Sequence, residues 1–152
     1  MRSADQPRNH IPHQKILSVF LLVIAIVNVI SCAAGAWGIA TAGPQLFGAD
    51  LLAGTLFEDQ YWLAALALAF VGLVQILALI AHLSRSRWVA TLHAFAGMTM
   101  VVFIFVEVLI INETFFLQPL FFGLGALQLS LSPLFWQLLP RRWPAREWGS
   151  SR

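Results

Sequence analysis

Four long apolar runs, separated by short polar segments, make up most of the chain. They cover about residues 16–41, 61–83, 88–112 and 115–139. Each run reaches the roughly 20 residues that an α-helix needs to cross about 30 Å of hydrocarbon. The runs lack the two-residue alternation of barrel strands, and a helix satisfies its own backbone in lipid. The pattern therefore predicts an all-α, antiparallel up-down four-helix transmembrane bundle.

The composition agrees with a membrane protein. Hydrophobic residues make up 59% of the chain and charged residues 11%, whereas a soluble domain has about 45–50% and about 25%. The membrane domain is expected at residues 16–139, between an N-terminal tail of residues 1–15 and a basic tail of residues 140–152. Because the net charge of +2 lies on these flanks and turns, topology explains it, and we expect no nucleic-acid partner.

The charges alternate between the connections. All 9 Lys and Arg lie before the first run, after the fourth, or between the second and third, where Arg85 and Arg87 stand. The other two connections carry acidic residues instead: Asp50, Glu58, Asp59 and Glu113. Since basic flanks stay on the cytoplasmic side, we predict a multi-pass protein of a bacterial cytoplasmic membrane with both termini cytoplasmic. Membrane lipids are its expected surroundings and partners.

Every predicted span carries at least one polar residue. Asn28, Gln75 and Gln128 are amides in the first, second and fourth spans, and the third span holds His93 and Glu107. Such side chains usually face the bundle interior and hydrogen-bond across helices, for about 0.6–2 kcal/mol each. We interpret the amides as contacts that hold helices together. An acid is different, because a charge at the bilayer centre costs about 2.5–3.5 kcal/mol, which makes Glu107 a candidate functional residue.

Glu107 shares a helix face with Met100 and His93, at seven-residue steps along the third span. A proton-coupled transporter with Glu107 as its titrating group is therefore one alternative function. The separation of His93 and Glu107 is about 21 Å along the axis, and the methionine between them cannot relay a proton. Glu107 lies about 28 Å from Trp88, close to the outer interface.

His82 and His93 flank the turn between the second and third spans. In an antiparallel hairpin both approach the cytoplasmic side, where two imidazoles can ligate haem or a metal. Bis-histidine haem binding is a second alternative. Against it, His93 lies about 6 Å deeper than His82, and two histidines are too few for a closed metal site. The competing interpretation places both at headgroup level.

The single cysteine has two interpretations. The stretch VISC at residues 29–32 fits a lipoprotein signal by residue type, in which case the chain is cut before Cys32, the thiol is lipidated and three spans remain. Alternatively, Cys32 packs inside a helix rich in small residues. The apolar run continues to about Ala40, longer than the roughly 7–15 residues of a signal. One cysteine also excludes an intramolecular disulfide or a CxxC pair.

Two stretches carry a family resemblance: GPQLFGADLLAGTLFEDQYW at residues 43–62 and VEVLIINETFFLQPLFFGLG at residues 106–125. Together they resemble a group of small bacterial four-span membrane proteins of uncharacterised function, in which Leu-Gln-Pro opens the last helix. This chain departs from that group at Gln60, Tyr61 and Trp62, where a Pro-Gly pair is expected. The resemblance implies the four-span fold and no catalytic residue.

The chain shows no Ser/His/Asp set, no HExxH motif and no phosphate-binding loop. The connections are also too short to hold a soluble active site. We therefore expect a non-enzymatic accessory or partner-binding protein without a cofactor, whose partners are other membrane proteins or further copies of the chain.

Overall fold

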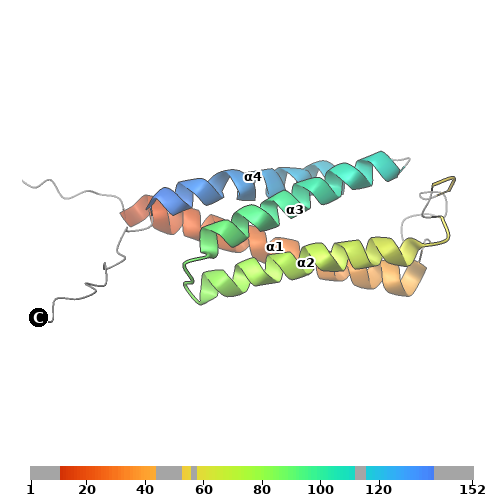
Figure 1. The fold of residues 1–152 in the computed structure, drawn as a ribbon, viewed down its shortest axis with the longest axis horizontal. Helices are drawn as coiled ribbons and strands as arrows, with labels where there is room; N and C mark the ends of the chain where they lie inside the picture. Colours follow the sequence, from red (N-terminus) through yellow and green to blue (C-terminus); the bar gives the residue numbers. More distant parts are fainter. Residues whose placement is uncertain (1–10, 44–52, 56–57, 112–115, 139–152) are drawn as a thin grey trace, which may run out of the picture.

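A computed structural model describes residues 11–43, 53–55, 58–111 and 116–138 of the chain. Four α-helices make up almost all of them: α1 (Ile11–Ala42), α2 (Tyr61–Leu83), α3 (Val89–Ile110) and α4 (Leu117–Leu138). These residues include no strand. The helices run alternately up and down and lie along one another in an elongated bundle (Figure 1). The predicted all-α, up-down architecture is confirmed in these residues.

The helix bounds follow the apolar runs closely. α2 has the predicted bounds, and α3 and α4 are shorter than predicted by one or two residues at each end. The largest difference is in α1, which begins at Ile11 rather than near residue 16. Pro12 in its first turn suits a helix start, because the first N–H groups of a helix have no partner inside it. The last residues of the predicted N-terminal tail are therefore helical.

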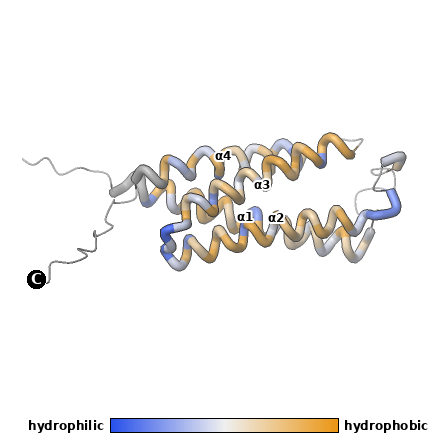
Figure 2. The backbone as a smooth tube through the Cα atoms, viewed as in Figure 1, coloured by the Kyte–Doolittle hydropathy of each residue, from blue (hydrophilic) through white to orange (hydrophobic). Residues whose placement is uncertain are grey.

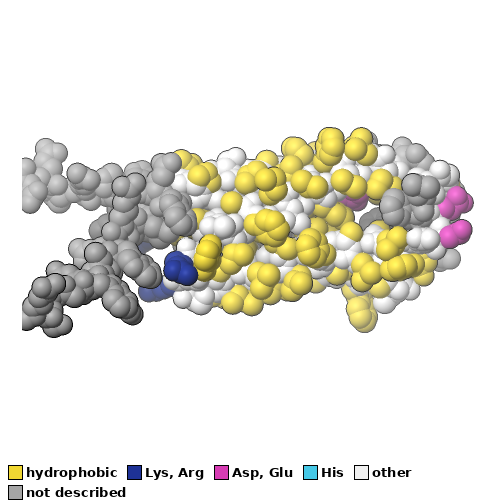
Figure 3. Space-filling view, viewed as in Figure 1, with side chains coloured by type: hydrophobic (Ala, Val, Ile, Leu, Met, Phe, Trp, Pro, Cys, Tyr) yellow, Lys and Arg dark blue, Asp and Glu magenta, His cyan; other side chains and the backbone are white. Residues whose placement is uncertain are grey.

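Opposite charges lie at opposite ends of the bundle. Arg85 and Arg87, in the turn between α2 and α3, lie at the same end as the start of α1 and the end of α4, whereas Glu58 and Asp59 lie at the other end (Figures 1 and 3). We call these the basic end and the acidic end. Hydropathy is high along the helices and low at the two ends (Figure 2). This distribution is the one expected of a bundle that crosses a membrane.

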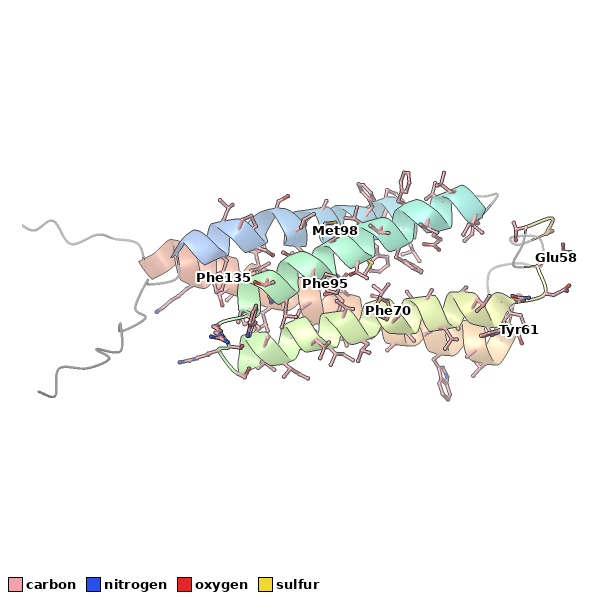
Figure 4. The ribbon with its side chains drawn as sticks, viewed as in Figure 1. Glu58, Tyr61, Phe70, Phe95, Met98 and Phe135 are labelled. Carbon is pink, nitrogen blue, oxygen red and sulfur yellow. The ribbon has the colours of Figure 1, made fainter. Side chains whose placement is uncertain are left out.

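Three helices are long and apolar enough to cross a membrane: α1 from Lys15, α2 and α3. Their outward faces carry large apolar side chains, including Phe70, Phe95 and Met98, which are all about half exposed (Figure 4). In water such a surface would aggregate. The chain is therefore a small membrane protein. α4 is similar in length to α2 and α3 but carries more polar residues than either, together with two prolines.

Small residues let the helix backbones approach. A Cβ atom added at Gly97 of α3 would lie 2.6 Å from the carbonyl oxygen of Gly125 on α4, and one added at Gly72 of α2 would lie 3.0 Å from Cβ of Cys32 on α1. α3 packs most extensively on α4, and α1 on α2. Since lipid tails are as apolar as the side chains, close packing of this kind is a main source of helix association in membranes.

The interior has apolar clusters at both ends of a polar centre. Near the basic end, buried side chains of all four helices form one cluster: Leu21, Ala81, Val89, Ala90 and Phe135. Toward the acidic end a second cluster, the apolar layer, consists of Cys32, Val71, Met100 and Ile104. Phe135 near the basic end is labelled in Figure 4. Polar side chains are buried between these clusters.

Candidate functional site

Four buried polar side chains, one from each helix, occupy the centre of the bundle. Asn28 of α1, Gln75 of α2, His93 of α3 and Gln128 of α4 each have 0% of their surface exposed. The sequence identified them separately, as polar residues within the four predicted spans. The structure joins them in one hydrogen-bonded group that extends through His82 to Ser18. We call these six residues the buried polar chain.

Gln128 is the hub of the buried polar chain. Its Oε1 accepts hydrogen bonds from Asn28 Nδ2 at 3.3 Å and from Gln75 Nε2 at 3.2 Å. Its Nε2 donates to Gln75 Oε1 at 3.0 Å and lies 3.0 Å from Nδ1 of His93. Gln75 Nε2 also donates to the carbonyl of Ala96 at 3.3 Å. One amide on α4 thus connects all four helices.

The two histidines continue the chain toward the basic end. His93 Nε2 lies 2.9 Å from His82 Nδ1, and His82 Nε2 lies 2.9 Å from the hydroxyl oxygen of Ser18. Because Gln128 Oε1 receives two amide donors, its Nε2 is the donor toward His93 Nδ1. A neutral His93 then carries its proton on Nε2 and donates to His82, which donates to Ser18. The three hydrogen bonds from Gln128 through the histidines to Ser18 therefore all point from the centre toward the basic end.

The direct bond between His82 and His93 corrects the expectation that their depths do not match. The Cα–Cβ bond of every helical residue tilts toward the N-terminus of its own helix. In antiparallel helices, His82 therefore tilts into the bundle from the end of α2, while His93 tilts back toward the turn from the start of α3. The two tilts close the offset of about 6 Å that the rise per residue implies.

The geometry of the histidine pair does not resemble that of haem ligands. Axial histidines lie on opposite faces of a macrocycle, whereas these ring centroids are 5.1 Å apart and the rings bond directly to each other. All four ring nitrogens already have partners. His93 is fully buried among the helices, so its side chain does not contact lipid headgroups directly. In the described part of the chain, no three His, Cys, Asp or Glu residues are grouped to hold a metal.

Glu107 lies apart from the buried polar chain. It is partly exposed and stands in the last turn of α3, where its carbonyl accepts a hydrogen bond from the N–H of Ile111 at 2.9 Å. Met100, on the same helix face, is 2% exposed and belongs to the apolar layer. This layer lies between Glu107 and the buried amides. The described residues therefore provide no continuous hydrogen-bonded path from His93 to Glu107.

Cys32 lies in the interior of α1, which continues unbroken to Ala42. Its side chain is 2% exposed and packs in the apolar layer beside Gly72 of α2. This is the position that the packing interpretation predicts. In the lipoprotein interpretation, by contrast, Cys32 becomes the first residue of the chain and the first two thirds of α1 are lost.

Sequence reasoning missed Ser18 and Gln118 as buried or bonded polar residues. Ser18 accepts the last hydrogen bond of the buried polar chain, and Gln118 at the start of α4 is 3% exposed. The available signal was the same for both, a single polar residue within an apolar run. That signal does not say which neighbour the side chain meets.

The fold and the buried polar chain together define a small α-helical membrane protein with a hydrogen-bonded interior. Comparison with known protein families, with curated proteins and with solved structures finds no match. The resemblance to small bacterial four-span proteins therefore stays a prediction.

Proposed function

We propose that the protein is a non-enzymatic accessory protein of a bacterial cytoplasmic membrane, which binds another membrane protein or further copies of itself through its outer surface. The observation that carries this proposal is that the buried polar chain is bonded within the bundle. Its side chains pair with one another rather than opening toward a substrate. The outer apolar faces are then what the protein offers to other molecules.

In this proposal α4 is the fourth span. Three of its polar residues face inward, since Gln118, Gln128 and Ser132 are all buried. Its outward side chains are mostly apolar and include Phe122, Leu127 and Leu134. A helix with this distribution suits lipid on one side and the bundle on the other.

Both termini and the α2–α3 turn are proposed to be cytoplasmic, on the strength of the basic residues at that end. Reporter fusions inserted at Arg85 and at Gly54 test this orientation. We expect a cytoplasmic signal at Arg85 and an external signal at Gly54. Finding both sites in one compartment would overturn the proposed topology.

Photo-crosslinking in native membranes tests partner binding. A photoreactive phenylalanine analogue is placed at Phe70 on α2 or at Phe95 on α3, both half exposed. If one face binds a protein, that position should give a discrete higher-mass band, identified by mass spectrometry as a second copy or another membrane protein. The other position then serves as the lipid-facing control. Lipid adducts alone at every outward position of the four helices would contradict the proposal.

A proton-coupled transporter is the second candidate function. The observation that favours it is the directed hydrogen-bonded chain from Ser18 at the basic end to Gln128 at the centre. The apolar layer between this chain and Glu107 opposes it. In liposomes with an imposed pH gradient, a transporter should show flux that Glu107→Gln removes. Absence of flux in the native protein would reject this function.

A further inference from the structure

A groove opens on the outer surface between α3 and α4, in the half of the bundle nearer the basic end. Its volume is about 500 Å³, it is open rather than enclosed, and its lining is mostly apolar: Ala90, Thr91, Ala94, Leu129, Ser132 and Pro133. It is separate from the buried polar chain, although Ser132 lies at its floor with 1% of its surface exposed.

The groove exists because small alanine side chains on α3 face a serine on α4 whose hydroxyl bonds to its own helix. Ala90 and Ala94, four residues apart, give α3 a low surface at this point. On α4, the Ser132 hydroxyl turns inward and donates to the carbonyl of Gln128 at 2.6 Å. No long side chain therefore fills the space between the helices. In a membrane such an open apolar hollow contacts hydrocarbon.

A basic residue stands in the turn that leads into the groove. Arg87 lies two residues before α3 begins at Val89 and three residues before Ala90, the first residue of the groove lining. The backbone already turns here, since Val89 N–H donates to the carbonyl of Ser86 at 3.2 Å. The Arg87 guanidinium carbon lies 5.2 Å from the ring centroid of Trp88. Tryptophan at a helix end marks the depth of the lipid headgroups.

We propose that the α3–α4 groove binds one acyl chain of an anionic phospholipid, with the lipid phosphate at Arg87. Thr91 is exposed in the groove wall and supplies a hydroxyl at the depth of the glycerol esters. An anionic headgroup is selected over a zwitterionic one because a basic residue near the surface favours it. The inference depends on insertion of the bundle in a membrane and is independent of any protein partner.

Native mass spectrometry of the full-length protein tests this site. The purified protein is titrated in detergent with phosphatidylglycerol or phosphatidylcholine of identical chains. We expect one molecule of phosphatidylglycerol to bind preferentially. Arg87→Gln should lower this preference about fivefold, the equivalent of about 1 kcal/mol. Arg85→Gln is the matched control from the same turn. Arg85 lies five residues before Ala90, and its backbone φ of 52° differs from that of a helix. Its side chain is therefore not expected to reach the groove, and Arg85→Gln should change the preference for phosphatidylglycerol less than twofold.

A second pair of variants tests the groove itself. Ala94→Phe fills it and should abolish the preferential site, whereas Ala69→Phe, at an exposed position on α2, should leave it intact. If Ala94→Phe fails to fold by circular dichroism, Ala94→Leu replaces it. The proposal is overturned by equal binding of the two lipids to the native protein, by equal effects of Arg85→Gln and Arg87→Gln, or by retention of the site in a folded groove-filling variant.

Discussion

The hub position of Gln128 makes its replacement the most informative test of the buried polar chain. Gln128→Met keeps the length of the side chain and removes both polar atoms. The change deletes four hydrogen bonds, two with Gln75, one with Asn28 and one with His93. At an average of about 0.6 kcal/mol per interhelical bond in a membrane protein, the direct loss is about 2.4 kcal/mol. The partners left unpaired add to this, so we expect a destabilisation of about 2–4 kcal/mol.

Unfolding by SDS in mixed micelles, followed by circular dichroism, measures this effect. The control is Ser130→Ala on the same helix, where the exposed hydroxyl bonds to the carbonyl of Ala126 at 2.8 Å. Surface changes of this kind cost less than about 0.5 kcal/mol.

A double-mutant cycle separates the network from simple packing. Gln75→Met and Gln128→Met each break both bonds between the two amides and leave the remaining amide without that partner, whereas the double variant removes both amides. The double variant should therefore cost about 1–2 kcal/mol less than the sum of the two single variants. Additivity within about 0.5 kcal/mol would refute the direct pairing of the amides. A Gln128→Met variant as stable as Ser130→Ala would refute the role of the whole chain in stability.

Three further outcomes follow from the packing and the hydrogen bonds. Gly97→Ala should destabilise the bundle by about 1–3 kcal/mol in the same SDS assay, because the added methyl group meets the backbone of α4. Gly123→Ala is the control: a Cβ atom there has nothing within 4 Å, so the change should be neutral or stabilising. Solid-state ¹⁵N spectra at neutral pH should show His93 protonated on Nε2, and protonation on Nδ1 would contradict the bond from Gln128. Cys32 should resist a maleimide reagent until the protein is denatured, and an intact mass without residues 1–31 would instead support the lipoprotein interpretation.

The helices could be predicted from the sequence because their cause is local. A long apolar run in lipid has one way to satisfy its backbone, and the runs ended at Gly, Pro or charged residues. α2 has the predicted bounds for this reason. α1 extends further than predicted because hydropathy marks the membrane core, and a helix can continue beyond it as far as the first turn at Pro12.

The pairing of the polar residues could not be predicted. A position along a span gives depth, but rotation about the helix axis depends on packing with neighbours. Gln75 of α2 and Gln128 of α4 bond to each other across the bundle, although the most extensive packing is of α3 on α4 and of α1 on α2. The histidine pair could not be predicted for a similar reason. The rise per residue placed the two rings at different depths, but in the structure the opposed tilts of the two side chains bring the rings into contact.

Hydropathy along the chain determined that this protein is a helical membrane protein, and the order of charges predicted the opposite ends at which Arg85 and Glu58 lie. Only the tertiary structure decided that six polar side chains form one chain, that Glu107 lies beyond an apolar layer, and that a groove opens between α3 and α4. The physical reason is that burial in lipid acts on each segment separately, whereas hydrogen bonds and close packing between helices depend on the geometry of all four together.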